Sequence, residues 1–386
     1  MLWQSVEKST KSCCETLWRA GFEAYPVGGC VRDLLLGRTP GDWDVTTNAL
    51  PEQVMAVFDH TVPTGIKHGT VTVIIEGTAI EVTTFRTETG YSDGRHPDGV
   101  RFDATLEQDL ARRDFTVNAM ALARDGSVID PFGGQADLQA KLIRCVGEPD
   151  RRFSEDALRM FRAVRFGAQL GFAIEKNTLE ALKQNARKAK QLAGERVRVE
   201  VEKTLCSARP ELVEVLFGLD LMGAWSAQKP TKTGRLAALP CEPMLRWAGL
   251  CACLETDDVE GFLRGLKLDG ATVRACAAGW ELWQAGIPFT DRDWRGALAR
   301  YGEDGCRAAA AMAGAEDLQQ LDMVLAQNPC FRVEQLALSG GELAKMGLSG
   351  PEIGRVQRRL LDHVLDCPKD NCVLVLREKA QEFVKI

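Results

Sequence analysis

The sequence predicts an α+β fold, in which a small mixed sheet with helices is followed by a chain that is helical to its end. Short apolar runs alternate with turn residues over about the first 146 positions. The runs at 71–75 and 79–86 are joined by Glu76-Gly77, a hairpin signal. From about residue 148 onward no strand pattern appears. Strands separated by helices in the first part, and helices alone afterwards, are typical of an α+β protein.

Length and composition limit the class of protein. With 386 residues, 45% of them apolar and 26% charged, the chain is expected to be globular and to form two to four domains. No run of about 18 apolar residues occurs, so we expect no membrane span. The thirteen cysteines are scattered without a CxxC pair, which predicts reduced cytosolic thiols and argues against a metal site built from them.

Helices and short strands are expected to alternate before the hairpin. Gly21 would end the first helix, Gly37 would end the second, and Pro51 suits the first turn of the third. The expected elements are helices over 3–20, 31–36 and 50–57 and strands over 22–27 and 42–46.

The turn between the first strand and the second helix carries a phosphate signal. Gly28 and Gly29 let the backbone approach a ligand closely, and the N–H groups at the start of the following helix favour phosphate. Arg32 and Asp33 follow within the same helix. We therefore place Gly28, Gly29 and Arg32 among the nucleotide-binding candidates.

Two aspartates follow at a spacing that suits a metal ion. If 42–46 is a strand, its period of two directs Asp42 and Asp44 to one face and Trp43 to the other. Two carboxylates beside a phosphate-binding turn predict a site for Mg²⁺ bound together with a nucleotide. A DxD pattern on its own is more often a polar strand end or turn.

The returning strand and the loop after it add further candidates. Glu81 shares a strand face with Thr83 and Phe85 and is a candidate third catalytic carboxylate beside the aspartates, although a glutamate facing solvent is an equal alternative. Residues 87–101 have no apolar period and contain three glycines, which predicts a mobile loop long enough to have a function.

A helix is expected over 106–122, with a dense polar group inside an otherwise apolar stretch. That group consists of Arg112, Arg113, Asp114 and Asn118. A strand, a turn and a second strand at 128–146 would close the first domain.

The segments described so far resemble motifs of a known family. Gly-Gly-x-Val-Arg-Asp from Gly28 with the Asp42-x-Asp44 pair, Arg-Arg-Asp-Phe-Thr-x-Asn-Ala at 112–119 and Asp-Pro-Phe-Gly-Gly at 130–134 are similar to class II nucleotidyltransferases of the polymerase-beta superfamily. This group holds the tRNA CCA-adding enzymes and the bacterial poly(A) polymerases. The resemblance implies a polymerase-beta-like head followed by a helical neck, body and tail.

The resemblance also implies roles for individual residues. In the second motif, Arg113 and Asp114 would bind the triphosphate and the ribose. The chemistry agrees, because a guanidinium can hold phosphate oxygens through two hydrogen bonds and Asp114 and Asn118 can hydrogen-bond sugar hydroxyls. The loop at 87–101 matches a flexible loop linked to addition of the terminal A. Its matching residues include Arg86, Glu88 and Asp93.

A further helix is expected over 153–166, with Ser154 as its N-cap and Arg159, Arg162 and Arg165 along one side. On such a helix Asp156 and Arg159 would project to the same side. An aspartate only accepts hydrogen bonds and an arginine only donates them, so the pair satisfies cytosine or adenine. Uracil and guanine present a carbonyl acceptor and a ring N–H donor, the reverse of the order in cytosine and adenine. Each group left unpaired in the site would cost about 1–3 kcal/mol of binding free energy.

The family uses this motif to select the nucleotide, which agrees with the argument from hydrogen bonds. The alternative is that Asp156 and Arg159 form an ordinary intrahelical ion pair.

Residues 144–203 contain 14 Lys and Arg against 9 Asp and Glu in a chain of net charge −6. This local excess of positive charge is compatible with a nucleic-acid path or with a solvated helical face. Residues 194–203 match a neck motif that we interpret as a helix held by i,i+4 ion pairs.

The tail contains a second candidate contact with RNA. The glycine-rich turn before Pro351-Glu-Ile-Gly354 resembles a family segment that could hold an RNA phosphate, or is simply a tight turn between helices. The expected domains are a nucleotidyltransferase head (1–146), a base-recognising neck (147–205), a body (206–300) and a tRNA-binding tail (301–386).

The resemblance implies a cytoplasmic enzyme that adds CCA to tRNA 3′ ends from CTP and ATP without a template, with Mg²⁺ as cofactor. Its partners would be tRNA, CTP and ATP, with no membrane and no deducible protein partner. Alternatives are a poly(A) polymerase, an enzyme that adds only A or only CC, and a catalytically silent RNA-binding protein. The segment 65–72 looks like the CCA-adding version of its loop, and the full-length loop at 87–101 disfavours CC-only addition.

Overall fold

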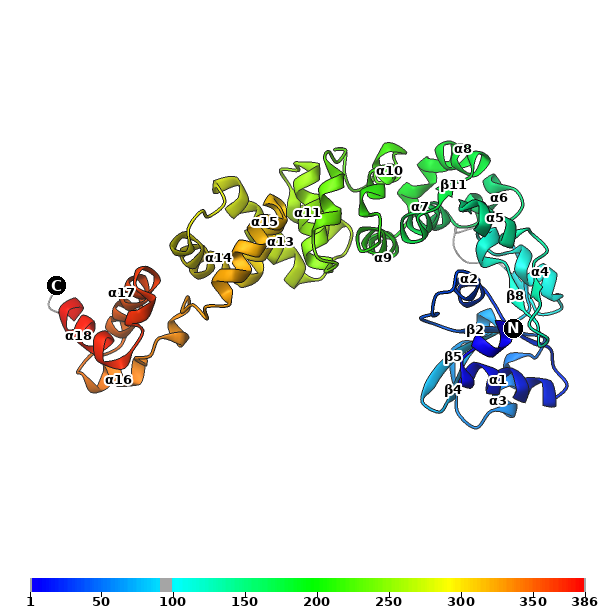
Figure 1. Cartoon of the computed structure of the whole chain (residues 1–386), viewed down its shortest axis with the longest axis horizontal. Helices are drawn as coiled ribbons and strands as arrows, with labels where there is room; N and C mark the ends of the chain where they lie inside the picture. Colours follow the sequence, from blue (N-terminus) through cyan, green and yellow to red (C-terminus); the bar gives the residue numbers. More distant parts are fainter. Residues whose placement is uncertain (1, 91–98, 385–386) are drawn as a thin grey trace. The chain divides into compact units, whose positions relative to one another are not determined.

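The computed structural model describes residues 2–90 and 99–384, which fall into two compact units divided between residues 224 and 225 (Figure 1). Every strand in the described residues lies in the first unit, and the second is built from helices, which confirms the α+β fold class. The finer division of the chain at residues 146, 205 and 300 stays a prediction.

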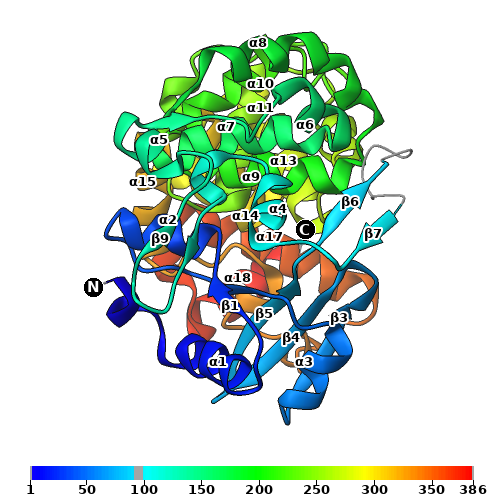
Figure 2. The same cartoon turned by 90° about the vertical axis from the view of Figure 1, so that its right-hand side faces the viewer.

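A five-stranded mixed sheet forms part of the first unit, in the order β1-β2-β5-β4-β3 (Figure 2). β2 runs parallel to β5, which brings Asp44 opposite Glu81, and the other neighbouring pairs are antiparallel. The strands are β1 (Ala24–Pro26), β2 (Asp44–Thr47), β3 (Thr61–Gly65), β4 (Thr70–Ile75) and β5 (Thr78–Thr84). The hairpin predicted at Glu76-Gly77 is confirmed.

Two helices, α1 (Lys8–Arg19) and α3 (Pro51–Val57), pack against the sheet. β4 alternates fully buried Val71 and Val73 with more exposed threonines, so one strand face joins the core. Leu17 of α1 belongs to the same core cluster. A third helix, α2 (Gly29–Leu35), follows β1 and carries the first motif.

The two ends of the segment 87–101, predicted as a loop, form short strands that pair with each other. β6 (Thr87–Thr89) pairs antiparallel with β7 (Gly99–Arg101). Asp93 lies outside the described residues.

The helix predicted over 106–122 is wrong. The chain forms α4 (Leu106–Ala111), a 3₁₀ turn η3 (Thr116–Asn118) and β8 (Ala121–Leu122). Phe115 is extended and pairs with Cys145, while the Thr116 N–H donates to the carbonyl oxygen of Arg144 at 2.9 Å. Pairing with a distant segment therefore overrides the local helix propensity of this apolar run.

Short helices and strands complete the first unit. They are β9 (Val128–Ile129), α5 (Gly134–Ala140), β10 (Leu142–Ile143), α6 (Pro149–Glu155), α7 (Leu158–Leu170), β11 (Ala173–Ile174), α8 (Lys176–Asn185), α9 (Gly194–Leu205) and α10 (Val213–Gly218). The expectation of no strand after residue 148 is wrong, because β11 pairs parallel with β10.

The single helix predicted over 153–166 is also wrong, since α6 ends at Glu155 and α7 begins at Leu158. Asp156 has an extended backbone, and its Oδ1 accepts a hydrogen bond from the Leu158 N–H at 3.0 Å. An aspartate that bonds to the backbone in this way competes with helix continuation. Ser154, expected as an N-cap, lies inside α6, where its hydroxyl donates to the carbonyl oxygen of Asp150.

The second unit consists of helices in its described residues. They are α11 (Pro243–Leu254), α12 (Val259–Gly265), α13 (Gly270–Ala285), α14 (Asp291–Ala313), α15 (Ala315–Leu325), α16 (Gly340–Lys345), α17 (Pro351–Asp366) and α18 (Val373–Val384). Residues of α16, α17 and α18 share one hydrophobic cluster, which includes fully buried Leu343, Leu360 and Leu376. Among the described residues, no helix combines the length and apolar character needed to cross a membrane.

Candidate active site

A cavity of about 540 Å³ in the first unit is lined by residues of α2, β2, α7 and α9 and of the segment around η3. It holds all of the predicted site residues except Gly28 and Glu81. These are Gly29, Arg32, Asp42, Asp44, Arg113, Asp114, Asn118, Asp156, Arg159, Arg162 and Arg165. Residues that lie more than 130 positions apart in the sequence thus line one cavity.

The turn from β1 into α2 brings the backbone against Arg113. Gly28 has a φ of +83°, and its N–H donates to the carbonyl oxygen of Met120 at 3.0 Å. A Cβ at this position would lie 2.7 Å from Nη1 of Arg113. The position therefore requires glycine both for its backbone conformation and for the close approach of the guanidinium.

We expect Gly28→Ala to lower kcat/KM for nucleotide addition by at least about tenfold, because the new methyl group would displace Arg113. Gly37→Ala is the matched control, since Gly37 also has a positive φ, of +69°, but a Cβ there would meet nothing within 4 Å. Both variants should lose stability in urea unfolding because alanine disfavours a positive φ, and Gly28→Ala should lose more because its methyl group also displaces Arg113. Equal activities of the two variants would contradict this role for the turn.

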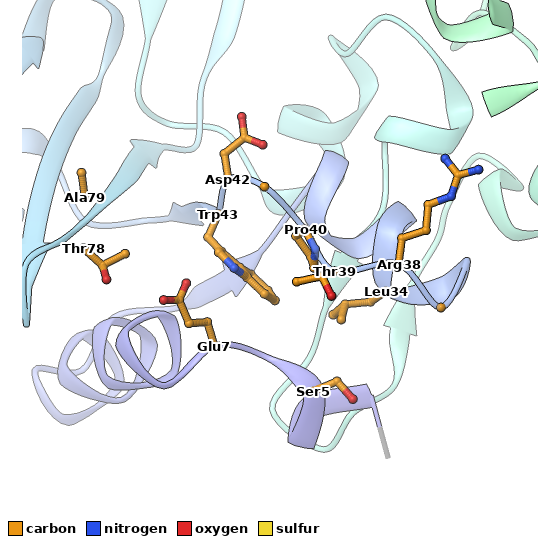
Figure 3. A pocket seen from close by; sticks show the side chains of 12 residues that line it. Ser5, Glu7, Leu34, Arg38, Thr39, Pro40, Asp42, Trp43, Thr78 and Ala79 are labelled. Carbon is orange, nitrogen blue, oxygen red and sulfur yellow. The ribbon is translucent and has the colours of Figure 1, made fainter. Parts of the chain in front are cut away.

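Asp42 and Asp44 both line the cavity, although β2 begins only at Asp44 and the strand predicted over 42–46 is therefore shorter than expected. Trp43 is buried, and its indole points away from the Asp42 carboxylate (Figure 3). Burial and the charges of Glu81 and Asp42 raise the pKa of Asp44 to about 6, although Arg113 opposes this shift. The crowding of negative charge favours a cation at this point.

Glu81 is exposed and does not line the cavity, so the structure shows only its electrostatic effect on Asp44. Within residues 2–90 and 99–384, the one group of three potential ligands gathered within 4.8 Å of one another lies elsewhere in the chain. The role of Glu81 as a third catalytic carboxylate stays a prediction.

Arg113 is held beside the aspartates by a buried carboxylate that the sequence analysis did not identify. Asp109 is fully buried, and its Oδ2 lies 3.7 Å from Nη2 of Arg113, while its Oδ1 accepts a 2.9 Å hydrogen bond from Arg112. Burial lowers the pKa of Arg113, and the carboxylate of Asp109 opposes this shift. Its buried Nε has no hydrogen-bond partner among the described residues, so a ligand oxygen could satisfy it.

Asp114 organises the centre of the cavity. Arg162 donates to its Oδ2 at 2.7 Å through Nε, and Asn118 donates to its Oδ1 at 3.2 Å. Burial would raise the pKa of Asp114, but the guanidinium groups of Arg162 and Arg159 outweigh it and lower the pKa to about 2. Asn118 also accepts a 2.7 Å hydrogen bond from Arg32, so these side chains are held in one network.

Phe166 supports three of the predicted arginines. The guanidinium carbons of Arg32, Arg162 and Arg165 lie 5.3, 5.3 and 4.0 Å from its ring centroid. Cations within about 6 Å of a ring centroid are attracted to the face of the ring, so Phe166 stabilises these arginines in the cavity.

The predicted base-reading residues line the same cavity, but each has a partner. Asp156 is paired with Arg196 of α9 at 2.8 Å, and Arg159 donates to Glu155 at 2.7 Å and to the carbonyl oxygen of Arg112 at 3.1 Å. The helical i,i+3 geometry proposed for Asp156 and Arg159 is wrong, because Asp156 lies in the break between α6 and α7. The two side chains are instead oriented by these separate partners.

The cavity has a strong excess of positive charge. Seven arginines and one lysine line it, against four aspartates. Guanidinium groups bind phosphate oxygens with two parallel hydrogen bonds, so this lining suits a polyanion such as a triphosphate. Acidic groups for a cation, cations for phosphates and a donor–acceptor pair for a base are thus combined in one cavity.

Comparisons with known proteins agree with this geometry. Residues 24–144 match the family described as Poly A polymerase head domain, and residues 171–224 match the probable RNA and SrmB-binding site of polymerase A. A CCA-adding enzyme of Limosilactobacillus fermentum is 38% identical over 392 residues, covering 95% of this chain and 94% of that protein. This chain belongs to the CCA-adding enzyme family.

Further members of the family are similar in sequence and structure. A CCA-adding enzyme of Geobacillus kaustophilus is 48% identical over 271 residues, or 68% of this chain and 67% of that protein. The crystal structure of the Bacillus stearothermophilus CCA-adding enzyme in complex with CTP superposes with a TM-score of 0.80 at 34% identity, covering 98% of this chain and all of that one. The Thermotoga maritima enzyme complexed with tRNA shares the fold at 22% identity and a TM-score of 0.73.

The contribution of α9 to the site differs from its interpretation as a helix held only by its own ion pairs. One i,i+4 pair is present, between Arg198 and Glu202 at 3.9 Å. Shorter pairs reach out of the helix, from Arg196 to Asp156 and from Glu200 to Arg165 at 2.6 Å. The neck motif identified Arg196 and Glu200 as members of a helix. Their ion-pair partners on other elements could be identified only from the structure.

A second cavity, of about 730 Å³, is also lined by Asp42, together with Trp43 (Figure 3). Its walls include Leu34, Pro40 and Trp43, and Arg38 is the one cation among its lining residues. It lacks the cations that a triphosphate requires, so the smaller cavity fits a nucleotide better.

Proposed function

We propose that this protein adds CCA to the 3′ end of tRNA, using CTP and ATP and releasing pyrophosphate, without a nucleic-acid template. The observation that carries the proposal is the single cavity that joins Asp42 and Asp44 to the cationic lining and to the pair Asp156 and Arg159. Membership of the CCA-adding enzyme family supports the same reaction.

Asp42 and Asp44 fit a divalent cation, and we propose Mg²⁺. Their carboxylate oxygens are the ligands that hard cations prefer. Burial raises the pKa of Asp44 most, and the charges of Glu81 and Asp42 raise it further, so a cation beside this carboxylate would stabilise its charged form. When bound, the ion would increase the acidity of the attacking hydroxyl and neutralise charge on the phosphates.

The protein's own residues would position the triphosphate and the sugar. Arg113 lies against the turn at Gly28 and lowers the pKa of Asp44, so it can bind phosphate oxygens beside the cation and stabilise the charge that develops on them. Asp114 and Asn118, fixed by Arg162 and Arg32, can hydrogen-bond sugar hydroxyls. Holding both ends of the nucleotide would align its α-phosphate for in-line attack.

Base selection would rest on Asp156 and Arg159. The Asp156 carboxylate can accept from the exocyclic amine of cytosine or adenine, and Arg159 can donate to the adjacent ring nitrogen. Arg196 and Glu155 orient the two side chains and leave further donor and acceptor sites for a base. Uracil and guanine would place acceptor against acceptor and donor against donor.

Activity should depend on pH through Asp44. Its raised pKa means that the carboxylate takes up a proton as the pH falls through about 6, and the proton competes with the cation. The Mg²⁺ concentration for half-maximal rate should therefore rise about tenfold between about pH 7 and pH 5. Glu81→Gln should move this transition to lower pH because it removes a charge that raises the pKa. A magnesium requirement that does not change over this range would contradict the assignment.

The tRNA would extend beyond the nucleotide site. The glycine-rich turn links α16 to α17, and Ser339 caps α16 by accepting a hydrogen bond from the Glu342 N–H. We propose that this tail segment contacts the tRNA backbone. Free thiols at all thirteen cysteines are consistent with a cytoplasmic location, which we also propose.

A poly(A) polymerase is the second candidate, because the matched head family carries that description. Single labelled nucleotides offered to tRNA lacking CCA, to tRNA ending in CC and to oligo(A) distinguish the alternatives. C on the first primer and A on the second, with nothing on oligo(A), would support CCA addition. Addition of A alone would indicate an A-adding enzyme, C alone a CC-adding enzyme, long A tracts a poly(A) polymerase, and no addition an RNA-binding protein.

A further inference from the structure

Three side chains that bind transition metals meet at the C-terminal end of α17. His363 is in the last turn of that helix, Cys367 follows the helix, and Asp370 ends a 3₁₀ turn, η8 (Pro368–Asp370). Their ligand atoms all lie within 4.8 Å of one another, and Nε2 of His363 is 2.8 Å from Oδ2 of Asp370. An imidazole nitrogen, a sulfur and a carboxylate oxygen thus converge within eight residues of sequence.

The backbone that carries these side chains is well supported. The Cys367 N–H donates to the carbonyl oxygen of His363 at 2.8 Å, and the Asp370 N–H donates to that of Cys367 at 3.0 Å. The next residue, Asn371, accepts from the Ala337 N–H at 2.8 Å and so ties the turn to the chain before α16. The ligands are therefore arranged before an ion binds, which lowers the cost of ordering them.

We propose that His363, Cys367 and Asp370 form a binding site for a transition-metal ion of the Zn²⁺ class. Sulfur and imidazole ligands favour Zn²⁺ over Mg²⁺, so the site is chemically distinct from the acidic pair in the first unit. Cys367 is exposed, and the side chains of His363 and Asp370 are 22% and 36% exposed, so an ion can enter from solvent. Three protein ligands leave a fourth tetrahedral position for water.

Nearby charges do not occupy the site. Asp366, the neighbouring carboxylate, is paired with Arg292 at 2.7 Å, and Lys379 donates to Glu382 at 3.0 Å. The absence of CxxC pairs in the sequence argues against a metal site made from cysteines alone. It does not exclude the proposed site, which takes one ligand each from a histidine, a cysteine and an aspartate. A bound ion would connect the end of α17 to the turn before α18.

The test is a Co²⁺ titration of the reduced, full-length protein with excess Mg²⁺ present to occupy the acidic pair. We expect one equivalent of Co²⁺ to bind with the near-ultraviolet charge-transfer absorption of a thiolate ligand, and Zn²⁺ to displace it. Cys367→Ser should abolish this absorption, and Asp370→Asn should weaken Zn²⁺ binding at least about tenfold.

Cys372→Ser is the matched control, since Cys372 is an exposed thiol five residues further along the chain. This variant should retain both the absorption and the affinity, and circular dichroism should show that all of the variants are folded. No thiolate absorption in the unmodified protein, or absorption that survives Cys367→Ser, would overturn the proposal and leave His363 and Asp370 as a hydrogen-bonded pair only. Nucleotide addition should be unchanged in Cys367→Ser, so the result is independent of the proposed function.

Discussion

The Asp44→Asn variant is expected to add nucleotides at least about a thousandfold more slowly than the unmodified protein, equivalent to about 4 kcal/mol of transition-state stabilisation. Asp44 is the carboxylate that begins β2, faces the cavity and carries the raised pKa. Its amide analogue keeps the shape of the side chain but removes the charge that would hold the cation. The measurement is the single-turnover rate of CMP addition to tRNA lacking CCA.

Folding and tRNA binding should be largely retained in this variant, because Asp44 makes no ion pair among the described side chains that would be lost. Glu76→Gln is the matched control: Glu76 lies in the hairpin turn after β4 and its carboxylate pairs with exposed Lys8. Surface pairs of this kind contribute little, so its activity should be normal. An Asp44→Asn protein with near-normal rates would show that the metal assignment is wrong.

The Arg159→Ala variant is expected to lose selectivity before it loses all activity. Without the guanidinium, the ring nitrogen of cytosine or adenine loses its hydrogen-bond donor. The donor-against-donor mismatch that rejects uracil and guanine is lost as well. At about 1–3 kcal/mol per mismatched buried group, the preference for CTP over UTP should fall by about 5- to 150-fold. The ratio of kcat/KM for CTP and UTP measures this effect, and Asp156→Ala should act in the same direction.

Arg151→Ala is the control for Arg159→Ala, because Arg151 pairs with the same Glu155 from the outside of α6 and its side chain is 71% exposed. It should leave the CTP to UTP ratio unchanged. Arg196→Ala tests positioning, since it frees Asp156 without removing a proposed base contact. We expect intermediate selectivity from it. Unchanged selectivity in Arg159→Ala and Asp156→Ala would contradict selection by this pair.

Local sequence signals predicted the elements whose stability depends on local patterns. The alternating β-branched residues of β4 and β5 and the Glu76-Gly77 turn predicted the hairpin, and Gly37 predicted the end of α2. The run from Phe115 to Leu122 was assigned wrongly because every apolar residue in it is buried, so its pattern fits a helix as well as extended structure. Its pairing partners, Arg144 and Cys145, were not visible from the local pattern.

More of the site residues than of the surrounding helices and strands were predicted correctly from the sequence. The motif residues were found because their types match the chemistry of phosphates, cations and bases, and the structure gathers nearly all of them in one cavity. Asp109 and Arg196 were missed as partners because ion pairing across elements depends on tertiary contacts. The break at Asp156 was missed because the apolar pattern on both sides of it fits one continuous helix, and a side-chain hydrogen bond such as that from the Leu158 N–H to Asp156 leaves no mark in that pattern.

The central claim is that this protein alone determines the sequence CCA. The most direct test offers tRNA lacking CCA, Mg²⁺ and all four nucleoside triphosphates at equal concentrations to the purified protein, followed by sequencing of the added nucleotides. We expect C, C and A, in that order, after which addition stops. Incorporation of U or G at rates similar to C and A, or an extended tract of A, would contradict it.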